Sequence, residues 1–128
     1  MMTLQEFRQA RDLLSGILSP TNLIHSPYFS KQCGGNAYLK PENMQVTGAY
    51  KVRGACYKVS TLTEEEKARG LVTASAGNHA QGVAFAAQRA GIPATIVMPT
   101  TTPLVKVNNT KDYAVSYTHL TLPTTPYV

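Results

Sequence analysis

Lys51 is the first residue whose type and position could do chemistry. It follows Thr47-Gly48-Ala49-Tyr50 and stands near the predicted start of a helix. The positive end of the helix dipole disfavours a cation there. If the position is also desolvated, the neutral amine is favoured, and a neutral amine is a nucleophile that can form a Schiff base. The alternative is a solvated surface lysine, and the residues around Lys51 leave both interpretations open.

A second candidate is the segment Ser75-Ala76-Gly77-Asn78-His79, between a predicted strand and a predicted helix. Backbone N–H groups at such a junction bind an anion such as a carboxylate or a phosphate. Gly77 lets a ligand approach the backbone, and Asn78 offers both a donor and an acceptor. We interpret His79 as a supporting group and not as a catalyst. The alternative is an ordinary capped loop without a ligand.

Other well-known reactive motifs do not occur in the sequence. Neither a Walker phosphate loop nor a dinucleotide-binding GxGxxG is found, and there is no HExxH or Ser-His-Asp order. Cys33 and Cys56 have neither metal-ligand nor redox spacing, and the three histidines are widely separated. We therefore predict no metal site, and two buried or half-buried thiols in a reducing compartment.

The elements around these candidates alternate between helix and strand. Capping boxes (Thr3 with Glu6, Thr63 with Glu66) predict two helix starts, and Gly91 predicts a helix end. Thr47 and Asn78 are the expected caps of two further helices, and Pro27 is expected to end a strand. The expected helices cover residues 4–18, about 49–59, 64–69, 78–90 and a segment after Pro103, and the expected strands cover 23–25, 37–40, 71–74 and 94–98. We expect strand 71–74 to be buried. This alternation predicts an α/β fold, a parallel sheet with helices on both faces.

The final stretch, residues 115–128, differs from the rest. It has no helical period and no charged residue, and Pro123 and Pro126 exclude a central strand at its end. We expect an edge strand or a floppy tail that does not continue the alternation.

Composition and charge narrow the function classes. The chain has 128 residues, 43% hydrophobic and 15% charged, which is typical of one globular domain and excludes a disordered chain. Neither a membrane span nor a secretory signal is recognisable, so we expect a soluble cytoplasmic protein. The net charge of +5 comes from scattered residues. That pattern argues against nucleic-acid binding and fits a small anionic ligand better.

Two segments carry a family resemblance. KPENMQVTGAYKVRGA (residues 40–55) and SAGNHAQGVAFAA (residues 75–87) resemble the threonine dehydratases, which are pyridoxal-phosphate-dependent threonine ammonia-lyases of fold type II. The resemblance covers about the first 112 residues. It implies a partial fold type II architecture, pyridoxal 5'-phosphate as cofactor, threonine or serine as substrate, and a full-length parent that forms a homo-oligomer.

The resemblance also implies residue roles. Lys51 matches the lysine that holds the cofactor covalently and abstracts the substrate α-proton. Asn78 matches the residue that hydrogen-bonds the cofactor ring hydroxyl. Ser75, Ala76, Gly77, Asn78 and His79 match the loop that binds the substrate carboxylate. Threonine would give 2-oxobutanoate and ammonia, and serine would give pyruvate as a side activity.

Ala76 bears on the alternatives within the family. Serine racemases resemble this sequence too, but they have a second serine in this loop that supplies a proton to the opposite face of the carbanion. Ala76 has no exchangeable proton, which favours elimination over racemisation. A serine dehydratase or racemase stays an alternative. So does a non-catalytic α/β fragment that binds at most a small anion.

The resemblance also implies an incomplete enzyme. Family members are longer and carry a glycine-rich phosphate loop and a residue facing the pyridine nitrogen, neither of which is found here. We assign residues 1–40 to the N-terminal segment of the large domain, 41–113 to a partial small α/β domain and 114–128 to an unrelated tail. The expected result is a truncated fragment that is inactive alone.

Overall fold

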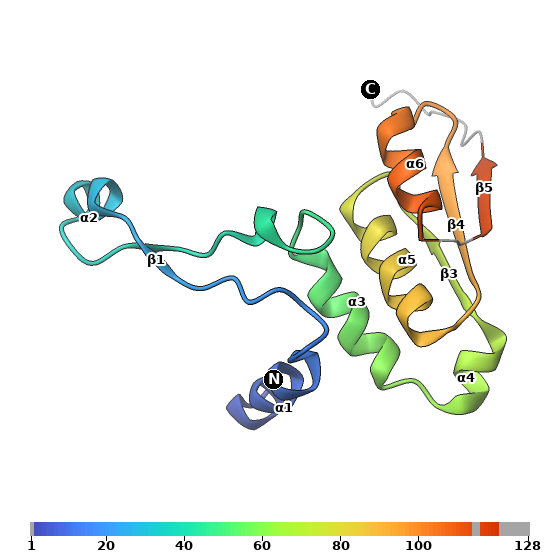
Figure 1. Ribbon diagram of the computed structural model, residues 1–128, viewed down its shortest axis with the longest axis horizontal. Helices are drawn as coiled ribbons and strands as arrows, with labels where there is room; N and C mark the ends of the chain where they lie inside the picture. Colours follow the sequence, from blue (N-terminus) through green and yellow to red (C-terminus); the bar gives the residue numbers. More distant parts are fainter. Residues whose placement is uncertain (1, 114–115, 121–128) are drawn as a thin grey trace, which may run out of the picture. The chain divides into compact units, whose positions relative to one another are not determined.

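The computed structural model describes residues 2–113 and 116–120 (Figure 1). Two compact units make up the chain, Met1–Tyr50 and Lys51–Val128. The predicted division after residue 40 refers to domains of a whole enzyme and stays a prediction. Among the described helices, none has the length and apolar character needed to cross a lipid bilayer.

Helix α1 (Leu4–Leu14) opens the first unit. The predicted capping box is confirmed: the Thr3 N–H donates to the Glu6 carboxylate at 2.6 Å, and the Glu6 N–H donates to the Thr3 hydroxyl at 3.3 Å. The helix ends four residues earlier than predicted, and of its apolar residues Leu14 is buried while Phe7 is 57% exposed.

A short hairpin-like arm follows, in which strand β1 (Ile24–His25) pairs antiparallel with strand β2 (Tyr38–Leu39). Both strands were predicted. Helix α2 (Pro27–Cys33) lies between them and was missed, because Pro27 was interpreted as the end of the strand. Ser26 accepts a hydrogen bond from Phe29 N–H and Pro27 is the first helical residue, which together are a helix-start signal. Gly34, with φ of 68°, ends this helix.

Polar contacts hold the remainder of the first unit, which contains the short 3-10 helix η1 (Glu42–Met44). The buried Gln45 carboxamide accepts from Ser19 N–H at 2.9 Å and donates to the Ser19 carbonyl at 3.0 Å. The Thr21 hydroxyl donates to the Glu42 carboxylate at 2.5 Å. The Lys40 ammonium donates to the Thr21 carbonyl. These bonds join segments that are distant in the sequence.

The second unit is built on a parallel sheet with strand order β3-β4-β5. Its strands are β3 (Leu71–Ala74), β4 (Ala94–Pro99) and β5 (Ser116–Leu120), and helices α5 (Asn78–Ala90) and α6 (Leu104–Lys111) connect them. The predicted α/β fold with a parallel sheet is confirmed. β5 occupies an edge, as one of the two alternatives for 115–128 allowed. It continues the alternation, contrary to expectation, and the rest of that stretch lies outside the described residues.

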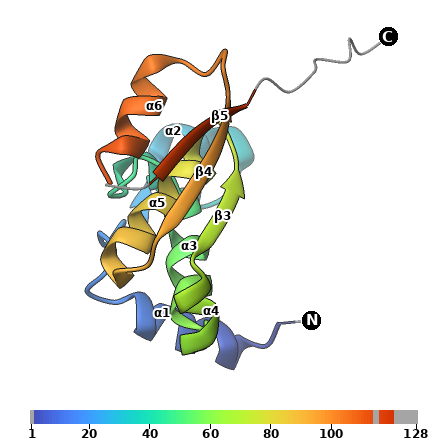
Figure 2. The same ribbon diagram turned by 90° about the vertical axis from the view of Figure 1, so that its right-hand side faces the viewer.

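The core of this unit lies between the sheet and its helices. Ile96 and Met98 of β4 pack with Ala80 of α5 and Val107 of α6, all at most 2% exposed. Figure 2 shows α5 and α6 on the same side of the sheet. On the other face Val72 is 78% exposed, and Leu71 and Thr73 on the first face are half-buried, so the prediction that β3 is a buried strand is wrong. Strand residues alternate between faces, and only one face has a described cover.

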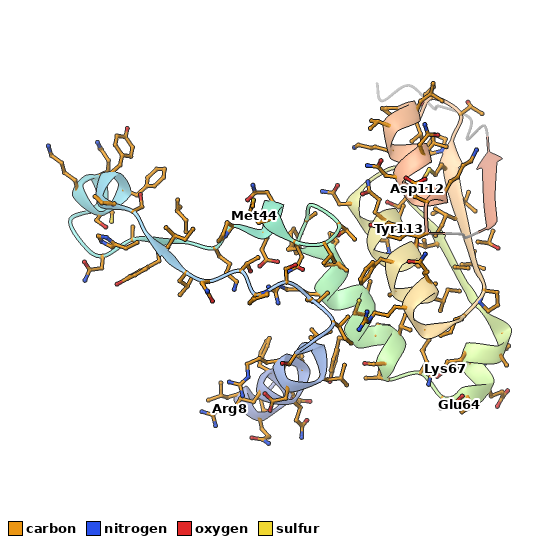
Figure 3. All side chains as sticks on the ribbon, viewed as in Figure 1. Arg8, Met44, Glu64, Lys67, Asp112 and Tyr113 are labelled. Carbon is orange, nitrogen blue, oxygen red and sulfur yellow. The ribbon has the colours of Figure 1, made fainter. Side chains whose placement is uncertain are left out.

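Helices α3 (Lys51–Ser60) and α4 (Glu64–Arg69) complete the second unit. The capping box of Thr63 and Glu66 is confirmed, and Lys67 forms an ion pair with Glu64 at 2.6 Å (Figure 3). Side chains of α3 are buried where this helix lies beside α5, and they are Val52, Ala55, Cys56 and Val59.

The two cysteines differ in exposure. Cys56 is buried on α3, and burial raises the pKa of its thiol to about 11, against the opposing effect of the Arg89 charge. Cys33 is exposed, so the prediction of a buried or half-buried thiol is wrong at that position. Cys33 is the last residue of α2, a helix that was not predicted, and no residue of this helix is buried.

Candidate functional site

Lys51 is the first residue of α3, which confirms its predicted place near the start of a helix. The helix begins two residues later than the predicted start near Ala49. Thr47, which was expected to cap it, donates its hydroxyl to the Ala49 carbonyl at 3.4 Å. The Lys51 side chain is exposed, so this chain shows the helix terminus but not the desolvation that the Schiff-base hypothesis also invoked.

The loop after β3 is fixed by backbone and hydroxyl hydrogen bonds. The Ser75 N–H donates to the Val97 carbonyl at 3.0 Å, which continues the hydrogen bonding between β3 and β4. The Gly77 N–H donates to the Ser75 hydroxyl at 3.3 Å. The loop is therefore held on the sheet at the carboxyl ends of two parallel strands, where open α/β sheets bind ligands.

Gly77, and not Asn78, is the N-cap of α5, which corrects the prediction that Asn78 caps this helix. Asn78 is the first helical residue, and the N-cap glycine has no side chain that could cap the helix start. The first N–H groups of a helix have no partner within the helix. The N–H groups of Asn78 and His79 are thus placed to bind an anion, and both side chains are exposed.

Gly82 brings Lys51 and this loop together. A Cβ built on Gly82 would lie 3.2 Å from the Lys51 carbonyl carbon, 3.2 Å from the Val52 nitrogen and 3.3 Å from the Lys51 carbonyl oxygen. Asn78 lies one helical turn before Gly82, and residues four apart share a helix face. The face of α5 that carries Asn78 is therefore the face that meets the start of α3, where Lys51 stands.

Lys106 is a residue of this region that the sequence analysis missed. Its ammonium nitrogen lies 3.8 Å from the position that a Cβ on Gly77 would take. Lys106 is the third residue of α6, which starts at the same edge of the sheet as α5. That shared edge is the signal that could have found it, because the helices after adjacent parallel strands begin side by side. Lys106 therefore places a positive charge beside Gly77 of this loop.

The arrangement can hold an anionic molecule with a carbonyl group. It combines a primary amine, an exposed amide and uncapped backbone N–H groups. These groups fit pyridoxal phosphate, whose aldehyde suits an amine and whose substrates carry a carboxylate. Within the described residues, no three side chains of His, Cys, Asp or Glu gather where they could share a metal ion.

Comparison with known proteins decides the family. Residues 14–121 match the family described as pyridoxal-phosphate dependent enzyme. The chain belongs to this family. The match runs past Tyr113, where the resemblance was expected to end. The assignment of 114–128 to an unrelated tail stays a prediction.

Individual members of the pyridoxal-phosphate dependent enzyme family are close to this chain. It is 52% identical over 112 residues to the L-threonine ammonia-lyase of Thermotoga maritima, covering 88% of this chain and 28% of that protein. The structure of maize serine racemase superposes with a TM-score of 0.85 at 34% identity, over 94% of this chain and 37% of that one. Threonine deaminase isoform 2 from Solanum lycopersicum superposes with a TM-score of 0.76 at 35% identity, over 93% and 36%.

These matches confirm the predicted partial fold type II architecture. They also show that the chain spans less than a third of the length of the Thermotoga relative. The residues of the candidate site all fall within the matched range of the family.

Proposed function

We propose that this chain supplies the lysine and the carboxylate-binding loop of a pyridoxal-phosphate-dependent threonine ammonia-lyase. The observation that carries the proposal is the contact at Gly82, which joins the start of the lysine-bearing helix to the helix that begins with Asn78. The identity to the Thermotoga L-threonine ammonia-lyase supports the reaction class.

The proposed roles follow from the chemistry of each group. Pyridoxal phosphate, when bound, supplies an electron sink for a carbanion at the substrate α-carbon. Lys51 Nζ would hold the cofactor and, once the substrate amino group had displaced it, would accept the α-proton as a free amine. The Asn78 amide hydrogen-bonds the cofactor ring hydroxyl. The backbone N–H groups of Asn78 and His79, with Ser75, Ala76 and Gly77, bind the substrate carboxylate, and Lys106 Nζ adds positive charge beside Gly77.

The products follow from elimination of the β-hydroxyl group. Threonine gives 2-oxobutanoate and ammonia, and serine gives pyruvate as a side activity. Ala76 carries only a methyl group and cannot deliver a proton to the carbanion, which favours elimination over racemisation. A serine racemase is the second candidate, because maize serine racemase has the same local fold.

Partners and location belong to the same proposal. The small-molecule partner is an amino acid, and the scattered basic residues support an anionic ligand in preference to nucleic acid. A homo-oligomeric whole enzyme in the cytoplasm is the assembly that the family resemblance supports. A non-catalytic chain that binds a small anion at the loop is the alternative from a different class.

The test is the visible absorption spectrum of the chain mixed with pyridoxal phosphate. We expect a Schiff-base band for the unmodified chain and for Lys58→Ala, whose lysine is exposed on the same helix, but not for Lys51→Ala. Addition of L-threonine should change the band, and release of 2-oxobutanoate would establish elimination. A chain without a Lys51-dependent band would contradict the proposal and favour the non-catalytic alternative.

A further inference from the structure

We propose that Gly82 is a positioning residue that sets the distance between Lys51 and Asn78. The inference rests on the proposed function, because it concerns the amine and the amide that act there on one cofactor. It starts from the close approach of α5 to the backbone at the start of α3.

The atoms closest to Gly82 all belong to the backbone. A methyl group on Gly82 would meet the Lys51 carbonyl carbon and the Val52 nitrogen at 3.2 Å, which is tighter than nine in ten real Cβ contacts. A flexible side chain could rotate away from such a methyl group, but a helix backbone cannot. The start of α3 would have to move by a few tenths of an ångström.

The composition of α5 makes the glycine conspicuous. Buried alanines occur in this helix before and after it, at Ala80, Ala84, Ala86 and Ala87. Alanine is the best helix former and glycine is unfavourable within a helix. Local helix propensity therefore favours alanine at position 82, and the contact with Lys51 is the feature of the structure that favours glycine.

The displacement matters because the amine is the reacting group. Lys51 and Val52 are the first two residues of α3, so a shift of their backbone moves the root of the lysine side chain. Asn78 is fixed to α5 one turn away from Gly82. A methyl group at position 82 would therefore separate the two groups without removing either of them.

Gly54 offers a matched control on the same helix as Lys51. It is exposed, and a Cβ built on it meets no atom within 4 Å. Gly54→Ala therefore adds one methyl group and raises the helix propensity of α3 without displacing Lys51.

The test compares Gly82→Ala, Gly54→Ala and the unmodified chain. Each is incubated with pyridoxal phosphate, reduced with borohydride and analysed by peptide mass spectrometry, with Lys58 as the internal reference. Circular dichroism reports whether each variant is folded. We expect folded Gly82→Ala to lower the Lys51-to-Lys58 modification ratio by about tenfold, because a misplacement of about 1 Å costs about 100-fold in such reactions. Gly54→Ala should keep the original ratio.

Each contrary outcome is decisive. A folded Gly82→Ala chain with an unchanged ratio would overturn the proposal. If Gly82→Ala does not fold, the double variant Gly54→Ala/Gly82→Ala is compared with Gly54→Ala, because Gly54→Ala stabilises α3. A double variant that also fails to fold would mean that Gly82 serves folding alone. An unmodified chain in which Lys51 reacts no faster than Lys58 would contradict the proposed function instead. In that case the lysines are labelled with acetic anhydride, and the ratio of Lys51 to Lys58 acetylation is compared among the variants. A ratio that changes in Gly82→Ala but not in Gly54→Ala would support the positioning role of Gly82, and an unchanged ratio would overturn it.

Discussion

The two units of the chain are each stabilised by a different kind of interaction. Unit Lys51–Val128 has an apolar core, with Val52, Ile96 and Met98 at most 1% exposed. In the described part of unit Met1–Tyr50, by contrast, the buried apolar side chains are Leu14 and Ala49. Apolar side chains of the first unit are exposed instead, among them Phe7, Leu23, Ile24, Tyr28, Phe29 and Tyr38.

This difference indicates that apolar packing gives the candidate site its rigidity. Lys51, the loop after β3 and Lys106 all belong to the unit with the apolar core, so close packing holds their backbone in place. The first unit depends on hydrogen bonds such as those of Gln45 and Thr21. Truncation of an apolar side chain should therefore destabilise the second unit more than the first. Removal of a side-chain hydroxyl should destabilise the first unit more than the second.

The largest contrast should come from isoleucine. Ile96 is fully buried in the second unit, whereas Ile24 is 55% exposed in the first. We expect Ile96→Ala to lower the free energy of unfolding by about 2–5 kcal/mol, because it leaves a cavity. Ile24→Ala should change it by less than about 0.5 kcal/mol. Urea unfolding of both variants measures the difference, and equal losses would refute the contrast between the units.

For two threonines we expect the larger loss of stability in the first unit. The Thr21 hydroxyl of the first unit donates to Glu42, whereas the buried Thr102 hydroxyl of the second has no hydrogen-bond partner among the described residues. Thr21→Val should lower the free energy of unfolding by about 1.5–3 kcal/mol, since it removes a hydrogen bond to a charged group. Thr102→Val should be neutral or stabilising, because it removes an unsatisfied polar group. The same unfolding assay applies, and a larger loss for Thr102→Val would contradict the account.

The smallest effect concerns the capping box, which occurs in both units. The Thr63 N–H donates to Glu66 at 2.8 Å and holds the pKa of that carboxyl below its ordinary value of 4.5, as Thr3 does for Glu6. A lowered pKa in the folded state contributes stability above the ordinary value, and that contribution is lost as pH falls through the folded pKa. The first turns of α1 and α4 should therefore loosen together on acidification.

Amide NMR of Thr3 and Thr63 against pH measures this effect. Glu6→Gln and Glu66→Gln are the controls, because glutamine keeps the capping box but does not titrate. Midpoints at or above the ordinary glutamate value would show that the carboxylates do not accept these bonds in solution.

Local signals in the sequence predicted much of this fold. Both capping boxes, strand β3 and the end of α5 at Gly91 lie where the residues indicated, because each depends on neighbours within a few positions. Helix α2 was missed although Ser26 and Pro27 carry a start signal, since proline was interpreted only as the end of a strand. The exposure of Val72 could not be predicted, because it depends on what covers a sheet face.

The candidate site divides in the same way. The Lys51 and Ser75–His79 segments could be selected from residue types and their place at helix starts. The approach of Gly82 to Lys51 and of Lys106 to Gly77 depends on how α3, α5 and α6 pack together. No pattern within either segment encodes those distances.

The most direct test of the central claim is to locate the lysine that takes up pyridoxal phosphate. Brief incubation, borohydride reduction and peptide mass mapping give the occupancy of every lysine in the chain. The account predicts that Lys51 is modified first and that L-threonine, added before reduction, lowers its occupancy. Modification spread evenly over Lys51, Lys58 and Lys106, with no effect of threonine, would contradict it.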